Sequence, residues 1–233
     1  MDSNVDLKSY WDDRIESGDR YSSIGRISYP KEVNRYAKNI AKEPIQQACD
    51  NNDLDLKGQQ VLDSGCGTGI YSKFYSDLGA EVTGFDFSES AIREIHKQGI
   101  PGNYSVQKLP DVGYTNDQFD FTHSFSVLYH ILDDTEWEKS IHQLARVTKT
   151  TGHILLRIEW TDEPGRASEH YKQRSRSEYK RVFNELGLEI VDTYLIKDKP
   201  SYPRVARYFP RLTTWLDLFT QDQSNQIVLL EFR

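Results

Sequence analysis

The chain has 233 residues, of which 36 are Asp or Glu and 29 are Lys or Arg, so its formal net charge is -7. This length suits one ordinary α/β domain with a full hydrophobic core, and the charge supplies no general field for attracting nucleic acid. The chain has no run of about 18 apolar residues, and its first ten residues lack the apolar core of a signal peptide. We therefore expect a cytoplasmic protein without a membrane span.

The first predicted elements indicate a sheet with helices on both faces, because short apolar runs alternate with segments of helical period from residue 58 onward. A helix over residues 31–40 comes before this region. A strand is expected over residues 60–64, followed by a helix whose apolar stripe is Ile70, Phe74 and Leu78. A second strand over residues 81–86 leads into a helix with Ser88 as its N-cap.

The second half of the chain continues the same pattern. A short strand is expected over residues 104–107 and another over 119–125, and Thr135 with Glu138 predicts a capping box that opens the next helix. A fifth strand and a further helix follow over residues 153–158 and 177–186. The last two strands, over residues 188–196 and 226–232, have no certain crossover helix between them and are compatible with an antiparallel pair.

A glycine loop follows the first strand, and its spacing narrows the choice of ligand. Gly65, Gly67 and Gly69 let a backbone approach a ligand closely. The dinucleotide fingerprint needs its third glycine one position later, where Ile70 stands, and no Gly-Lys-Ser/Thr follows as in a P-loop. Asp86 ends the second strand, where a carboxylate can accept hydrogen bonds from ribose hydroxyls. By itself Asp86 indicates only that the ligand contains adenosine. The alternative interpretation is an aspartate at a strand end that is simply solvated.

Four segments together resemble the class I S-adenosylmethionine-dependent methyltransferases of the type 11/25 kind. Residues 61–69 (VLDSGCGTG) are similar to the family's motif I and residues 81–88 (EVTGFDFS) to its second motif. Residues 119–131 and 151–156 resemble the fourth strand and the turn into the fifth, and the likeness spans roughly residues 57–158. It implies a Rossmann-like doubly wound sheet, mostly parallel with an antiparallel last strand, in a three-layer αβα arrangement.

The expected organisation is a single methyltransferase domain over residues 1–233. It comprises a helical cap over residues 1–50, a cofactor-binding core over 58–160 and an insert over 197–222 before the last strand. The insert, with its aromatic and arginine side chains between residues 202 and 219, is expected to form a pocket wall or ordinary packing rather than a membrane contact.

The resemblance also implies residues that bind S-adenosylmethionine. Asp63 would order the loop near the methionine amino group, Asp86 would bind the ribose, and Phe87 would flank the adenine. Where many relatives have an adenine-binding aspartate this chain has Ser105 or Val106, so backbone groups of Val106 and Gln107 are expected to serve instead. The remaining predicted cofactor residues border the loop, the methionine arm or the sulfonium: Ser64, Gly65, Gly67, Ser124, Phe125, Tyr10 and Trp11. The last two offer aromatic faces for a cation–π contact or anchor the N-terminal segment.

Catalysis is expected to rest mainly on proximity and alignment, with methyl transfer to an oxygen or nitrogen of a small-molecule acceptor. His130 is the candidate general base for a hydroxyl acceptor, or else a packing residue. No metal is expected, because the histidines lack paired ligand spacing. Three alternatives stay open: a noncatalytic module of the same fold, a methyltransferase acting on protein or RNA, and a nicotinamide-dependent oxidoreductase, which the glycine spacing disfavours.

Overall fold

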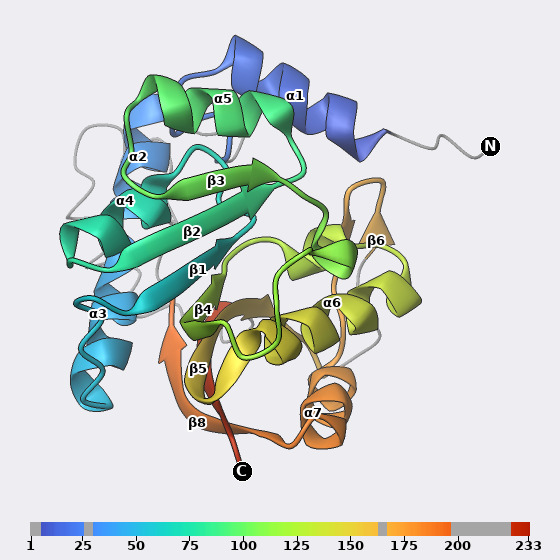
Figure 1. The fold of residues 1–233 in the computed structure, drawn as a ribbon. Helices are drawn as coiled ribbons and strands as arrows, with labels where there is room; N and C mark the ends of the chain where they lie inside the picture. Colours follow the sequence, from blue (N-terminus) through green and yellow to red (C-terminus); the bar gives the residue numbers. More distant parts are fainter. Residues whose placement is uncertain (1–5, 26–29, 163–166, 197–224) are drawn as a thin grey trace.

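One seven-stranded sheet organises the chain (Figure 1) in the order β3-β2-β1-β4-β5-β9-β8. The computed structural model describes residues 6–25, 30–162, 167–196 and 225–233. The strands of the sheet are β1 (Gln60–Ser64), β2 (Glu81–Asp86), β3 (Asn103–Val106), β4 (Phe119–Ser124), β5 (Thr148–Glu159), β8 (Leu188–Leu195) and β9 (Asn225–Phe232). A separate small hairpin joins β6 (Ala167–Ser168) to β7 (Tyr171–Lys172). The expected insert over residues 197–222 lies outside the described residues.

The direction of the strands confirms the predicted topology. Strands β1 to β5 pair in parallel, whereas β9 runs antiparallel to both of its neighbours, β5 and β8. A parallel connection needs a crossover, which the helices between the strands supply. They are α4 (Ile70–Asp77), α5 (Glu89–Lys97), α6 (Asp134–Val147) and α7 (Arg176–Glu185), with the short 3-10 helices η1 (Leu109–Asp111) and η2 (Leu128–His130).

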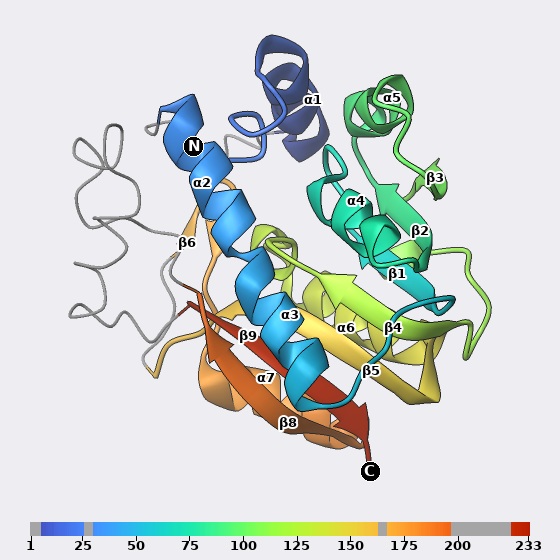
Figure 2. The same ribbon diagram turned by 90° about the vertical axis from the view of Figure 1, so that its left-hand side faces the viewer.

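Alternating side chains divide the core into two faces of the sheet. In β9, Ile227 and Leu229 pack with α3 (Lys42–Asn51) and α4, whereas Val228 and Leu230 pack with α6 and α7. Successive side chains of a strand point to opposite faces, so the apolar run of residues 227–230 within β9 serves both layers. The result is the expected three-layer arrangement of helices, sheet and helices (Figures 1 and 2).

Two local predictions need correction. In α4 Ile70 is buried as predicted, but Phe74 and Leu78 are only partly covered. Tyr71 and Tyr75 are buried in their place, because the helix presents a face rotated by about one residue to the sheet. Helix α6 is capped by Asp133, whose side chain accepts a hydrogen bond from the Glu136 N–H, and not by Thr135. A carboxylate at this position accepts a hydrogen bond from a backbone N–H of the first turn. Its negative charge also interacts favourably with the positive end of the helix dipole.

The N-terminal helices lie on one side of this core (Figure 2). Helix α2 (Lys31–Ile40) is followed directly by α3, which contacts β8 and β9. Helix α1 (Leu7–Ser17) buries none of its residues and is attached to α5 by polar contacts instead. Asp12 accepts hydrogen bonds from the Ser88 hydroxyl and, at 3.1 Å, from the Ser90 N–H. Within the described part of the chain, no helix combines the length and apolarity needed to cross a membrane.

Candidate functional site

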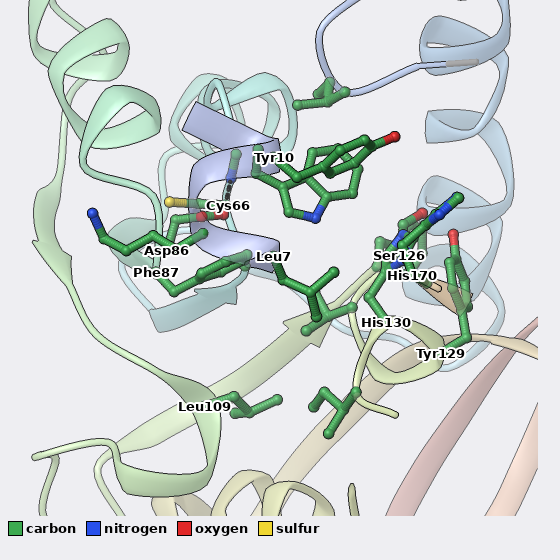
Figure 3. A pocket seen from close by; sticks show the side chains of 18 of the residues that line it. Leu7, Tyr10, Cys66, Asp86, Phe87, Leu109, Ser126, Tyr129, His130 and His170 are labelled. Atoms are coloured by element: carbon green, nitrogen blue, oxygen red, sulfur yellow. Dashed lines mark hydrogen bonds between the residues drawn. The ribbon is translucent and has the colours of Figure 1, made fainter. Parts of the chain in front are cut away.

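A cavity of about 1520 Å³ opens at the carboxyl ends of the parallel strands (Figure 3). The strand order reverses here, because the chain proceeds from β1 to β2 in one direction and from β4 to β5 in the other. Ligands of open α/β sheets bind at such a switch point. Ten of the thirteen predicted site residues line the cavity: Tyr10, Trp11, Gly65, Gly67, Asp86, Phe87, Val106, Gln107, Phe125 and His130.

The loop between β1 and α4 has the conformation that its glycines allow. Gly65, Gly67 and Gly69 all have positive φ angles, between 51° and 74°, which side chains with a Cβ rarely adopt. A Cβ on Gly65 would also collide with the side chain of Val127, and one on Gly69 would lie 2.9 Å from Ile95. Close packing therefore holds the ends of the loop, while Gly67 keeps its backbone open toward the cavity.

Asp86 joins the end of β2 to this loop. Its two carboxylate oxygens accept hydrogen bonds from the Gly67 N–H and the Ser88 N–H, each at 2.9 Å. Burial raises the pKa of Asp86 to about 6, although both N–H groups oppose that shift. A carboxylate accepts about four hydrogen bonds, so Asp86 retains acceptor capacity for a pair of ligand hydroxyls in the cavity.

Val106 and Gln107, the two residues predicted to bind the adenine, have different roles in the structure. The Gln107 N–H donates to the Asp86 carbonyl, and the Gln107 side chain bonds both the Ser105 hydroxyl and the Gly113 N–H. Val106 lines the cavity with a side chain that is 46% exposed. Gln107 therefore shapes this wall through internal bonds, while Val106 and Phe87 offer apolar surface to a flat ring.

His130 lies on the opposite wall, in η2 just after β4 (Figure 3). Its Nδ1 lies 2.5 Å from the backbone carbonyl oxygen of His170. A carbonyl only accepts, so Nδ1 carries the hydrogen and Nε2 keeps a lone pair. Burial lowers the pKa of His130 to about 4. His130 is therefore a neutral imidazole at physiological pH.

Tyr10 and Trp11 of α1 bring aromatic surface to this wall. The Tyr10 ring stacks on His170, with 5.5 Å between centroids, and the Trp11 ring meets His130 edge-on at 5.2 Å. The Arg14 guanidinium lies 5.6 Å and 4.9 Å from the Tyr10 and Trp11 ring centroids. Arg14 thus already makes the cation–π contacts that Tyr10 and Trp11 were predicted to offer to a sulfonium. This favours the alternative prediction, that the two rings anchor the N-terminal segment.

Charged side chains at the end of β5 complete the wall. Arg157 and Glu159 line the cavity, and their side chains are only 5% and 12% exposed. Their closest charged atoms are 3.8 Å apart, and the Tyr171 hydroxyl donates to Glu159 at 3.0 Å. Buried charges are costly unless they are paired, so this end of the cavity is built for polar recognition.

Comparisons with known proteins agree with this geometry. Residues 61–152 match the sequence profile of a family described as a methyltransferase domain. Ubiquinone biosynthesis O-methyltransferases from Xanthomonas oryzae pv. oryzae and Coxiella burnetii are 31% and 30% identical to this chain over 121 and 117 residues. These alignments cover 50% and 48% of the chain, and the chain spans about half the length of the curated relatives it matches (49% of each).

Solved structures share the fold at low identity. Magnesium protoporphyrin IX methyltransferase from Synechocystis PCC 6803, solved with bound SAM, superposes with a TM-score of 0.67 at 18% identity, covering 100% of this chain and 98% of that one. The [4+2]-cyclase SpnF gives a TM-score of 0.61 at 16% identity, covering 82% and 80%. Residues 61–152 thus match a methyltransferase domain, and the chain as a whole shares the fold of these structures.

Three residues that the resemblance implied for the site, Asp63, Ser64 and Ser124, do not line the cavity. Asp63 is 1% exposed and accepts hydrogen bonds from the Ser72 hydroxyl at 2.5 Å and from His123 Nδ1 at 3.0 Å. His123 is fully buried. Ser64 and Ser124 are paired in register on β1 and β4, and their buried hydroxyls have no hydrogen-bond partner among the described residues. All three support the floor of the site.

Sequence reasoning missed the part of the cavity that lies after β4. Arg157, Glu159, His170 and Tyr171 carried no motif, and the segment around residues 167–172 received no predicted element. A sequence signal existed only at Arg157, a charged residue inside an otherwise apolar predicted strand. His170 and Tyr171 become neighbours of His130 only because the β6–β7 hairpin packs against η2.

Proposed function

We propose that this chain binds S-adenosylmethionine in the cavity and transfers its methyl group to a hydroxyl oxygen of a small-molecule acceptor. One observation carries the proposal: a single cavity joins the glycine loop and Asp86 to the neutral His130. Its volume of about 1520 Å³ exceeds the roughly 300–1,000 Å³ of an ordinary ligand pocket, and so leaves room for two ligands.

The cofactor end uses the glycine loop and the end of β2. Asp86 would accept hydrogen bonds from the ribose hydroxyls with the acceptor capacity that Gly67 and Ser88 leave. Phe87 and Val106 would cover the adenine ring, and Phe125 would border the methionine arm. These assignments fit the polarity of each wall, because Asp86 is a buried carboxylate that lines the cavity, whereas Phe87 and Val106 are apolar.

The acceptor end uses His130. The bound sulfonium supplies an already activated methyl group, so the residues around the acceptor mainly have to align it and exclude water. As the acceptor oxygen attacks the methyl carbon, His130 Nε2 would take the hydroxyl proton, and the carbon–sulfur bond would break with its electron pair left on sulfur. A neutral amine needs no such base. A buried histidine in its neutral form therefore favours a hydroxyl group as the methyl acceptor.

The relatives support a small-molecule acceptor. The names of the relatives and of one structural neighbour specify ubiquinone biosynthesis and magnesium protoporphyrin IX, and the former are O-methyltransferases. The formal charge of -7 gives no support to an RNA acceptor. A second candidate rests on the [4+2]-cyclase neighbour, since a protein of this fold can carry out chemistry other than methyl transfer.

Binding and turnover measurements test the proposal. Calorimetry should detect binding of S-adenosylhomocysteine and weaker or no binding of NAD. Incubation of S-adenosylmethionine with a panel of phenols and aliphatic alcohols should form S-adenosylhomocysteine. His130→Ala should lower this turnover by roughly a hundredfold and leave cofactor affinity unchanged. Tight cofactor binding without transfer to any hydroxyl or amine would favour the second candidate, and tighter binding of NAD would refute the proposal.

A further inference from the structure

Arg174 is a fully buried cation close to, but outside, the candidate site. It is 1% exposed, and its guanidinium lies over the Trp137 ring at 4.5 Å from the centroid. Its Nη2 donates to the Ile131 carbonyl at 2.9 Å, and its Nε donates to the Asp134 carboxylate at 3.1 Å. The planar fork of an arginine suits such simultaneous contacts, which a lysine ammonium makes less well.

These contacts tie together two segments that are distant in the sequence. Ile131 directly follows His130, and Arg174 lies four residues after His170, beyond the β6–β7 hairpin. Lys172 strengthens the connection, because its Nζ lies 2.7 Å from the same Asp134 carboxylate. The link between Arg174 and Asp134 therefore sets the distance between the hairpin and the segment that carries His130.

That distance determines which nitrogen of His130 is free. A neutral imidazole can hold its hydrogen on either nitrogen, and the hydrogen bond made by one nitrogen selects the tautomer. The His170 carbonyl 2.5 Å from Nδ1 keeps the hydrogen there. Figure 3 shows His130 and His170 together on one wall of the cavity. If the hairpin moved away, this selection would be lost.

We propose that Arg174 is a positioning residue: it holds the β6–β7 hairpin against the segment after His130, and thereby fixes the His130 tautomer whose Nε2 accepts a proton. The catalytic consequence rests on the proposed function, whereas the tautomer does not. A buried arginine is a poor device for stability alone, because an apolar side chain of similar volume often stabilises as well or better. Its connection to both sides of the His130 contact gives it a specific role.

NMR of nitrogen-labelled protein tests the proposal directly, since the two imidazole tautomers have distinct nitrogen shifts. The chain has six histidines, and the His130 signals are identified as those missing in His130→Gln. At neutral pH we expect the Nδ1–H tautomer at His130. In Arg174→Lys we expect the Nε2–H tautomer to appear, with kcat reduced at least about tenfold and the KM for S-adenosylmethionine within about twofold.

Arg181→Lys is the matched control, because Arg181 is about half exposed and pairs with Glu138 and Glu185 away from the cavity. It should change neither tautomer nor turnover. If Arg174→Lys does not fold, Asp134→Asn weakens the same connection from a side chain that is 59% exposed, and should shift the tautomer in the same direction.

The two proposals fail separately. A folded Arg174→Lys or Asp134→Asn variant that keeps the pure Nδ1–H tautomer overturns the role of Arg174, as does an Nε2–H tautomer in the wild type. Failure of the wild type to bind S-adenosylhomocysteine would refute the proposed function, and would leave the tautomer measurement and its interpretation intact.

Discussion

At the scale of single residues, Asp86 couples the proposed cofactor site to pH. Its pKa of about 6 lies above the ordinary value of 3.8 because burial disfavours the charged form. For stability, the contribution of Asp86 is fully present below its ordinary pKa of 3.8 and is lost as the pH rises through about 6, because the unfolded chain ionises first. The affinity for the cofactor should instead rise with pH, since only the carboxylate form of Asp86 accepts hydrogen bonds from both ribose hydroxyls.

We therefore expect the affinity for S-adenosylhomocysteine to fall roughly tenfold between pH 7.5 and pH 5, as Asp86 takes up a proton. Asp86→Asn should bind more weakly at pH 7.5 and lack this dependence. Calorimetry across the pH range measures both, with circular dichroism to verify that the protein stays folded. Equal affinities of the wild type at the two pH values would contradict the ribose assignment.

Asp63 is predicted to act through stability. Asp63→Ala would leave the buried His123 Nδ1–H and the Ser72 hydroxyl without their acceptor, and each unsatisfied buried donor costs about 1–3 kcal/mol. The free energy of unfolding in urea should fall by roughly 2–5 kcal/mol. Asp120→Ala removes a half-buried carboxylate from the far end of β4 as a comparison. If the urea midpoint of Asp63→Ala equals that of the wild type, the hydrogen bonds of Asp63 with His123 and Ser72 do not stabilise the fold.

At the scale of elements, helix α1 covers the cavity while burying none of its own residues. Polar contacts attach it, among them ion pairs of Lys8 with Glu89 and of Glu16 with Arg93 on α5. Asp12 accepts from Ser88 and Ser90 at the start of α5, and Ser88 in turn donates its N–H to Asp86. The covering helix and the proposed ribose ligand thus share one residue, which connects the position of α1 to the cofactor site.

Loss of the Asp12 contacts should loosen α1. Two hydrogen bonds contribute about 1–3 kcal/mol, so Asp12→Ala should increase hydrogen exchange in residues 7–17 and speed the dissociation of S-adenosylhomocysteine up to roughly tenfold. Asp13→Ala, one position along the helix and exposed, is the control. Dissociation rates measured by stopped flow that are equal in both variants would show that α1 does not retain the ligand.

At the scale of the whole molecule, ligand binding should stabilise the fold, because the proposed site joins α1, the glycine loop and the β6–β7 hairpin. At a hundred times its Kd, a ligand adds about 2.7 kcal/mol to the free energy of unfolding. For a chain of this size the melting temperature should rise by roughly 5–10 °C with S-adenosylhomocysteine. The same concentration of NAD should give little shift, and an equal or larger shift with NAD would point to a different ligand.

The sequence alone predicted the features that depend on short-range preferences. Strands β1 and β2 were predicted with their observed bounds, Ser88 caps α5 as expected, and the predicted glycine loop follows β1, with positive φ at Gly65, Gly67 and Gly69. The α4 stripe and the α6 cap were displaced by one or two residues, because packing of α4 against the sheet and the competing carboxylate of Asp133 decided them. The features that were predicted correctly follow from dihedral preferences and side-chain alternation within a few residues.

Tertiary structure alone decided the other wall of the cavity. His130 and the carbonyl of His170 are 40 residues apart in the chain, and Arg174 lies still further from the segment that it holds. No periodicity or spacing encodes these contacts, because they depend on how the β6–β7 hairpin packs against η2 and the end of β5. The sequence by itself thus determined the resemblance to methyltransferases and the position of the glycine loop, whereas the hydrogen bond that holds the His130 imidazole depends on packing between distant parts of the chain.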